Sequence, residues 1–161
     1  MNTKRTQPPA YWTLVEPIWD SVDIYGEPDA FLRQYAAVRP IEAAHLFAAH
    51  WCQSEVCNGG FEQFFYNPTG VLAPEALEAF RLIGLREWAE CLEEAMRFFG
   101  DPYPRDNEAR QRALAQAIKA KRSPRATFIA EDTRVYKWNK RYPGDFNRLA
   151  NGYAYGIDER G

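Results

Sequence analysis

The stretch from His50 to Gly70 constrains the fold of this chain more than any other part of it. An apolar helical run leads into Asn58-Gly59-Gly60, phenylalanines follow at helical spacing, and Asn67-Pro68-Thr69-Gly70 closes the stretch. Asparagine and glycine tolerate the left-handed conformation that ends many helices, and the last tetrapeptide favours a tight turn. The sequence therefore predicts a helix that ends at the two glycines, a further short helix and then a turn.

Apolar residues spaced three and four apart predict helices along the rest of the chain, and prolines and glycines mark their ends. The expected helical segments run from Tyr11 to Tyr25 with a kink or restart at Pro17, from Pro28 to Val38, from Pro40 to Val56, from Pro74 to Leu82, from Arg86 to Phe99, from Asp106 or Asn107 to Lys121, over residues 128–139, and from Asp145 to Tyr153. The segment after Pro40 is apolar or small on several sides, which is typical of the most buried helix.

The predicted fold is all-α, a single compact domain of about seven or eight helices around a central buried helix. The chain shows no convincing strand pair, no internal repeat and no linker long enough to divide it. We expect the domain to span residues 11–156, after a flexible lead-in over 1–10 and before a polar tail over 157–161. A length of 161 residues, 46% of them hydrophobic and 15% aromatic, suits one domain with an aromatic-rich core.

The cysteines and the hydropathy indicate the compartment. Cys52, Cys57 and Cys91 are too few, and odd in number, for a disulfide framework, so a reducing cytoplasm is the natural setting. The first ten residues carry no apolar segment of the signal-peptide type, and no run approaches the roughly 18–20 apolar residues that span a membrane. We therefore expect a soluble cytoplasmic protein with no membrane partner.

The charges are unevenly distributed along the chain although the net charge is only -2. Residues 55–108 carry 11 acidic and 4 basic side chains, whereas residues 109–161 carry 12 basic and 5 acidic ones. Such asymmetry can steer partners. The interpretation that we favour is that the acidic and basic segments pack side by side and partly neutralise each other.

Five potential metal ligands or nucleophiles lie close together in the sequence: His45, His50, Cys52, Glu55 and Cys57. On a helix, His45 and Cys52 are two turns apart, roughly 10 Å, and no zinc-binding spacing is present. Cys57 would lie at a helix C-terminus, where the helix dipole raises a thiol pKa. We therefore predict no metal, no cofactor and no catalytic residue, and an enzyme is the less favoured class.

The polar residues around the two glycines form a candidate motif pocket. Its members are Glu55, Asn58, Gly59, Gly60, Gln63, Tyr66 and Asn67. Glu55 and Glu62 flank the break and could face one cleft, where paired carboxylates can do acid–base work. This leaves a small-ligand or enzymatic pocket as an alternative function, although we favour a role for Glu55 in bracing the loop.

Two opposite ideas about nucleic acid follow from the charged segments. Aromatic residues Tyr136, Trp138 and Tyr142 interleave with Arg134, Lys137, Lys140 and Arg141, after an earlier basic group at Arg110, Arg112, Lys119, Lys121, Arg122 and Arg125. Basic charge with aromatics can bind single strands, but a pI of about 5.8 argues against nucleic acid as a partner. Conversely, outward carboxylates at Glu87, Glu90, Glu93 and Glu94 could imitate a row of phosphates.

The stretch resembles a bacterial family of domains of unknown function, the DNA-mimic-protein-like family, which includes the DNA-mimic protein nineteen. The resemblance is carried by Glu55, by Asn-Gly-Gly-Phe from Asn58, by Gln-Phe-Phe from Gln63, and by Asn67 and Gly70. Ala73 to Ala76 and Phe98 to Pro104 are also similar, and the likeness covers roughly residues 11–150.

This resemblance implies an all-α fold, no established enzymatic activity and a relative that binds a transcriptional repressor. A DNA mimic is expected to be strongly acidic, whereas this chain has a net charge of -2. We therefore expect a non-enzymatic protein that acts by binding an unidentified protein partner, with a DNA-binding partner as one form of this role. Self-association into a homo-oligomer is a further expectation.

Overall fold

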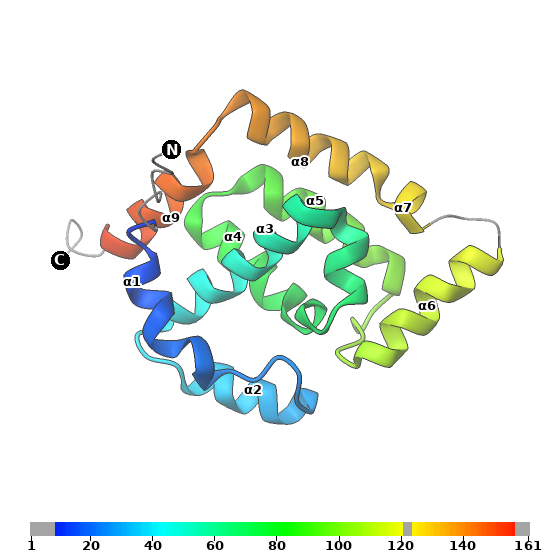
Figure 1. Cartoon of the computed structure of the whole chain (residues 1–161), viewed down its shortest axis with the longest axis horizontal. Helices are drawn as coiled ribbons and strands as arrows, with labels where there is room; N and C mark the ends of the chain where they lie inside the picture. The colour runs from blue at the N-terminus through cyan, green and yellow to red at the C-terminus, as the bar shows by residue number, and fades with distance from the viewer. Residues whose placement is uncertain (1–8, 121–123, 157–161) are drawn as a thin grey trace, which may run out of the picture.

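The computed structural model describes residues 9–120 and 124–156, and these residues fold into helices only (Figure 1). In chain order the elements are α1 (Trp12–Val15), the 3-10 helix η1 (Glu16–Ser21), α2 (Pro28–Ala37), α3 (Ile41–Tyr66), η2 (Pro68–Leu72), α4 (Ala73–Ile83), α5 (Arg86–Met96), η3 (Arg97–Phe99), α6 (Asn107–Lys119), α7 (Pro124–Thr127), α8 (Ile129–Arg141) and α9 (Asp145–Tyr155). The all-α prediction is confirmed. The predicted tail over 157–161 and most of the lead-in over 1–10 lie outside the described residues.

The helix α3 is the centre of the domain, as its composition predicted. Every residue from Ala43 to Ala49 is buried, and α1, α4, α6, α8 and α9 all pack against α3. Alanines at Ala44 and Ala48 leave room for these neighbours to approach closely. Figure 1 shows α3 passing through the middle of the molecule, with α8 and α2 at opposite edges.

The second half of α3 anchors an aromatic core. The Phe65 ring is fully buried, and its centroid lies 4.8 Å from that of Phe99, 5.3 Å from Phe128 and 5.4 Å from Phe64. These rings come from three separate parts of the chain. Burying an aromatic side chain contributes on the order of 2–3 kcal/mol, so this cluster is a major source of stability.

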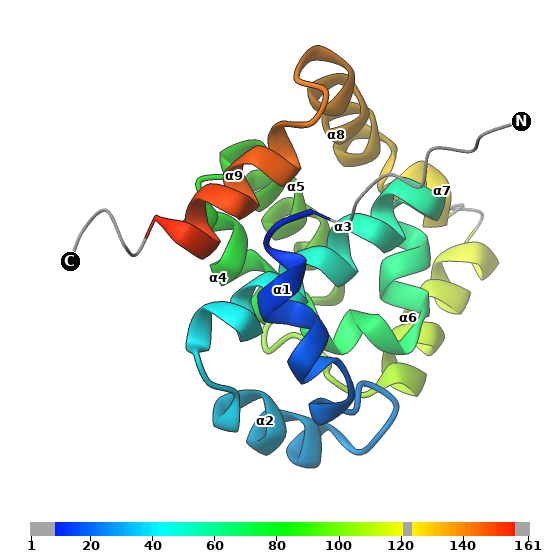
Figure 2. The same cartoon turned by 60° about the vertical axis from the view of Figure 1, so that its left-hand side comes forward.

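The first and last helices of the domain meet side by side on one flank (Figure 2). The Tyr11 amide donates to Oδ1 of Asn151 over 2.8 Å, and the hydroxyls of Thr13 and Tyr155 lie 2.8 Å apart. Two histidines of α3 reach the same flank. Nδ1 of His50 lies 2.9 Å from the Tyr11 hydroxyl, and Nδ1 of His45 lies 2.7 Å from that of Tyr153.

Some apolar residues of the helices are exposed. Leu32, Leu82 and Ile118 are 37%, 49% and 60% exposed, because each lies on the side of its helix that no neighbour covers. At the start of α9, Gly144 occupies the N-terminal cap position, and Asp145 pairs with Arg148 at 3.0 Å.

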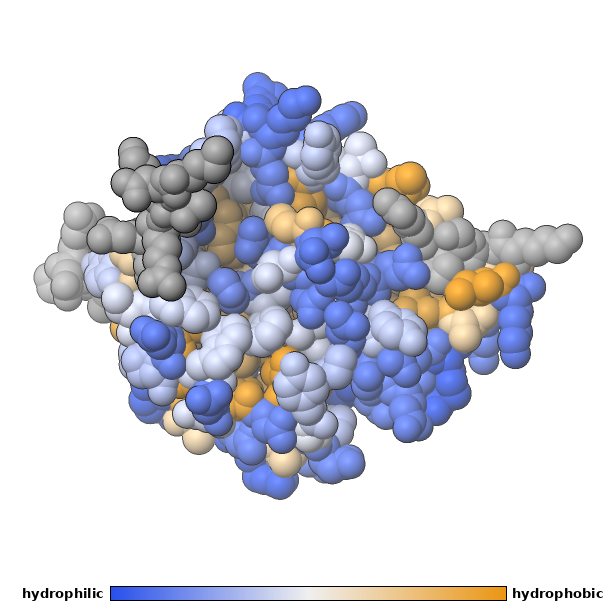
Figure 3. All heavy atoms as spheres, in the orientation of Figure 1, coloured by the Kyte–Doolittle hydropathy of each residue, from blue (hydrophilic) through white to orange (hydrophobic). Residues whose placement is uncertain are grey.

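The face seen in Figure 3 is mostly hydrophilic, and its hydrophobic residues lie in small separate areas. None of the helices within the described ranges is both long enough and apolar enough to cross a bilayer.

Candidate functional site

The break predicted at the two glycines is a kink inside α3. Gly59 has φ -147° and ψ 17°, and Gly60 has φ 77° and ψ -179°, a conformation that is open almost exclusively to glycine. The helix begins again at Phe61, whose amide donates to Oδ1 of Asp132 over 2.8 Å. A Cβ on Gly60 would lie 2.7 Å from the other carboxylate oxygen of Asp132. The kink thus brings α3 and α8 into direct contact. The expected left-handed helix end does not occur, because ψ of Gly60 is extended.

Glu55 is the polar centre on the other side of the kink. Its carboxylate accepts hydrogen bonds from Nε2 of Gln63 at 2.7 Å, Nδ2 of Asn67 at 3.1 Å and Oγ1 of Thr69 at 3.0 Å. Three of the predicted pocket residues therefore meet, together with the buried hydroxyl of Thr69, which the sequence did not single out. Their polar groups bond to one another across the kink and tie η2 to α3.

The remaining pocket residues lie elsewhere. Asn58, Gly59 and Gly60 line a surface hollow of about 340 Å³, whose other wall is formed by α8 through Asp132, Thr133 and Tyr136. Tyr66 is 53% exposed and lines neither this hollow nor the Glu55 network. Six of the seven residues are thus divided between a structural network and an open hollow, and Tyr66 belongs to neither.

Arg110, which the sequence analysis placed in a basic group considered for nucleic-acid binding, is instead a buried structural residue. Its side chain has no exposed surface, and Nε donates to the carbonyl of Phe65 over 3.0 Å. The terminal nitrogens donate to the carbonyls of Pro104, Arg105 and Asn67 and to Oδ1 of Asn107. The guanidinium thus satisfies carbonyls at the C-terminus of α3, where a cation also complements the helix dipole. Burial lowers the pKa of Arg110 from its ordinary value.

Gly70 is the one sequence signal that points to Arg110. A Cβ at this position would lie 2.7 Å from Nε of Arg110 and 2.9 Å from the Phe64 carbonyl. A glycine in a turn often marks such a close approach, but it does not indicate which residue approaches.

Among the described residues, the cysteines and histidines do not come together in a group that could hold a metal ion. Burial raises the pKa of the Cys52 and Cys57 thiols and lowers the pKa of His45 and His50. Cys57 receives hydrogen bonds from the amides of Gln53 and Asn139. Each histidine bonds to a tyrosine hydroxyl and packs at a helix contact, so these groups hold helices together.

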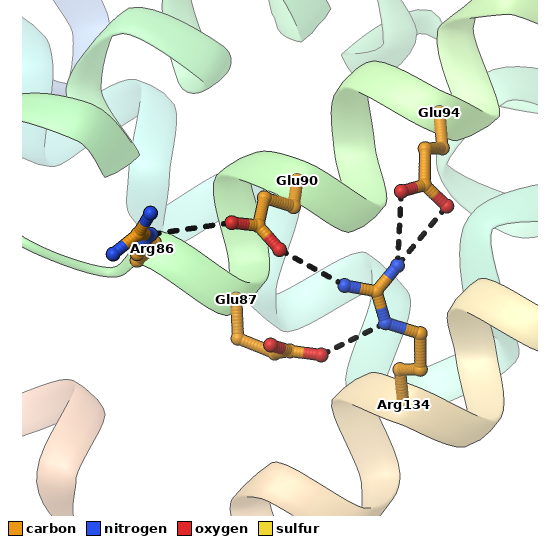
Figure 4. A network of polar contacts seen from close by, with 5 residues as sticks. All are labelled: Arg86, Glu87, Glu90, Glu94 and Arg134. Atoms are coloured by element: carbon orange, nitrogen blue, oxygen red, sulfur yellow. Dashed lines mark hydrogen bonds and ion pairs between the residues drawn. The ribbon is translucent and has the colours of Figure 1, made fainter.

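The acidic face of α5 is bridged by one arginine of α8 (Figure 4). Glu87, Glu90 and Glu94 lie on one face of α5, and Arg134 of α8 reaches all three, with nitrogen–oxygen distances of 2.8, 3.1 and 3.0 Å. Glu93 pairs with Arg81 at 2.8 Å. This confirms the expectation that acidic and basic segments pack together, and it removes the α5 carboxylates as a free row of negative charge.

Basic and aromatic side chains do gather beside this contact. A hollow of about 450 Å³ between α5 and α8 is lined by Arg86, Glu87, Arg134, Lys137, Trp138, Arg141 and Tyr142. The guanidinium of Arg141 lies 5.5 Å from the centre of the Tyr142 ring. Nucleic-acid binding by this segment stays a prediction.

A group of exposed carboxylates that form no ion pair with the described residues lies near the start of the chain, not on α5. The acidic segment consists of Glu16, Asp20, Asp23, Glu27 and Asp29, all of which are exposed. Among the described residues, none of these five carboxylates lies within ion-pair distance of a basic group. No lysine, arginine or histidine occurs between Glu16 and Asp29. This surface therefore keeps its negative field.

The comparison with known families agrees with the motif around the kink. The family model described as DMP19-like protein matches residues 39–157, which include α3, both hollows and the ion-pair network between α5 and α8. The searches of curated proteins and of solved structures each returned no match.

Proposed function

We propose that this chain, which belongs to the DMP19-like protein family, acts by binding a basic surface of a partner protein. The observation that carries the proposal is the acidic segment, five exposed carboxylates outside any ion pair of the described residues. Like charges in one segment attract an oppositely charged partner and raise the association rate. A clustered basic surface is the electrostatic footprint of a DNA-binding face, so a DNA-binding protein is the partner class that we favour.

The folded core supports a binding role over a catalytic one. The polar groups of Glu55, Gln63 and Asn67 are engaged with one another across the kink. The buried Arg110 is occupied by backbone carbonyls. These interactions stabilise a rigid scaffold, which presents surface charges in fixed positions.

Affinity capture from the source organism tests the proposal with three versions of the full chain. One is unchanged, one carries Asp20→Asn, Glu27→Gln and Asp29→Asn, and a matched control carries Glu62→Gln, Glu78→Gln and Asp101→Asn. We expect the unchanged chain and the control to retain the same protein and the first variant to lose it. A protein retained equally by all three would contradict the role of the acidic segment, and no reproducible partner would contradict the proposal itself.

A second measurement tests the class of partner. The captured protein should bind duplex DNA, and the unchanged chain should displace that DNA in a competition assay. Because exposed charges drive both contacts, each should weaken as salt is raised. A partner with no affinity for DNA would limit the proposal to protein binding alone.

A further inference from the structure

The acidic segment borders a hollow with aromatic walls. This aromatic hollow has a volume of about 430 Å³, within the usual range for ligand sites, and lies where η1 and the following loop meet α3. It is lined by Trp19, Asp20, Val22, Asp23, Ile24, Tyr25, Phe47 and Trp51. Its lining contains two carboxylates and no basic side chain.

The aromatic walls are held in place by their own packing. Trp19 and Trp51 stack with their ring centres 4.9 Å apart and an interplanar angle of 21°. Trp12 packs on Trp19 at 5.1 Å, and Phe47 meets it edge-on at 5.5 Å. Tyr25 adds a ring that is 76% exposed. A site formed before the ligand arrives loses little conformational freedom on binding.

We infer that the aromatic hollow receives an arginine side chain of the partner protein, an inference that rests on the proposed function. A guanidinium is planar, stacks on indole and phenol rings, and pairs with carboxylates through parallel N–H bonds. Asp20 and Asp23, which line the hollow together with Trp19, supply those carboxylates, and one oxygen of Asp23 also accepts from the Tyr25 amide over 2.9 Å. A lysine ammonium fits less well, because it is a strongly hydrated point charge without a flat face.

The sign of the charge separates this hollow from the one between α5 and α8. Arg86, Lys137 and Arg141 line that second hollow, where they would repel a cation. Both hollows offer tryptophan and tyrosine, so the acidic residues decide which one accepts arginine.

Titration of the full-length ¹⁵N-labelled chain with N-acetyl-arginine amide tests the inference directly. We expect saturable shifts of the indole N–H signals of Trp19 and Trp51, and no shift for the buried Trp88. The neutral citrulline analogue should give no saturable shift, and the lysine analogue should bind several-fold more weakly. An equal response to citrulline or lysine, or no response to arginine, would overturn the inference.

Two pairs of variants locate the binding. Asp20→Asn should weaken arginine-amide binding about threefold, whereas Asp29→Asn, in the same acidic segment but outside the hollow, should leave it unchanged. Tyr25→Ala should weaken binding by a similar factor, and Tyr136→Ala on α8 should not. Equal effects within either pair would contradict the placement in this hollow.

The two proposals can fail separately. If the arginine titration is silent while the triple acidic variant still loses its partner, the partner binds the acidic segment without using the hollow. If arginine binds but no partner is captured, the hollow is a cation site and the proposed function falls.

Discussion

Gly60 shows how a single residue sets the geometry of the longest helix. Residues other than glycine very rarely adopt its backbone dihedral angles, and Asp132 occupies the space that a side chain would need. The kink points the Phe61 amide at the Asp132 carboxylate, which acts as an N-terminal cap supplied by another helix.

We predict that Gly60→Ala lowers the free energy of unfolding by about 1–3 kcal/mol, the cost of this strained backbone in a residue with a Cβ. Urea denaturation followed by circular dichroism measures the change. Gly152→Ala is the matched control, because Gly152 lies inside α9 with open space around it, and there alanine should be neutral or stabilising. Equal losses in both variants would disprove the special role of Gly60.

Arg110 should be intolerant even of lysine. We predict that Arg110→Lys destabilises the domain by at least about 2 kcal/mol, since an ammonium cannot reach the carbonyls of Phe65, Asn67, Pro104 and Arg105 together. Arg112→Lys, on the exposed side of α6, should change stability by less than about 0.5 kcal/mol. Chemical denaturation of both variants checks the prediction, and similar stabilities would refute it.

The sequence predicts which backbone conformation a residue needs better than it predicts which distant residues that residue will contact. The kink followed from the Gly59-Gly60 dipeptide, and the role of Glu55 in bracing the loop followed from its position beside it. Asp132 and Arg110 could not be paired with the kink, because they lie 71 and 45 residues away from their partners along the chain. Arg110 also sits in a helix with other basic residues, where a buried arginine gives no distinctive pattern.

Among the elements, α8 contacts α5 through a cluster of ion pairs as well as through apolar packing. Val135 is the buried apolar residue of α8, and the neighbouring Arg134 bridges three glutamates of α5. The sequence predicted the acidic face of α5 from the spacing of its glutamates. The charge distribution predicted that a basic segment would pack against that face, but not that α8 and Arg134 would be the partners, because helical spacing says nothing about which helix lies opposite.

We predict that Arg134→Gln lowers the free energy of unfolding by about 1–2 kcal/mol, since it leaves three carboxylates close together without their cation. Amide hydrogen exchange in α8 should quicken more than in α4. Lys140→Gln on the same helix is the control and should leave both quantities nearly unchanged. Exchange rates that are equal in the two variants would show that packing alone holds α8.

For the whole molecule, the two histidines of α3 link the start of the domain to its end. His50 contacts Tyr11, the residue just before α1, and His45 contacts Tyr153 within α9. Burial lowers the pKa of both rings, so folding disfavours their protonated form. Below an unfolded-state pKa of about 6.5, the unfolded chain binds more protons than the folded one.

We therefore predict that stability is full above pH 6.5 and falls as the pH decreases below it, by up to about 1.4 kcal/mol per pH unit for each histidine. Denaturation midpoints at pH 7.5 and 5.5 measure this difference. His50→Gln should be less stable at pH 7.5 but should show a smaller decrease at pH 5.5. An unchanged pH dependence in this variant would exclude His50 as its source.

The caps of the short helical segment after the kink have a consequence for folding during synthesis. Its first amide is capped by Asp132 and its last carbonyls by Arg110, residues that the ribosome adds 71 and 45 positions later. The aromatic segment after Gly60 therefore emerges with both ends uncapped. Its helix is completed only when α6 and then α8 have left the exit tunnel, which makes the C-terminal helices the last step in forming the centre of the domain.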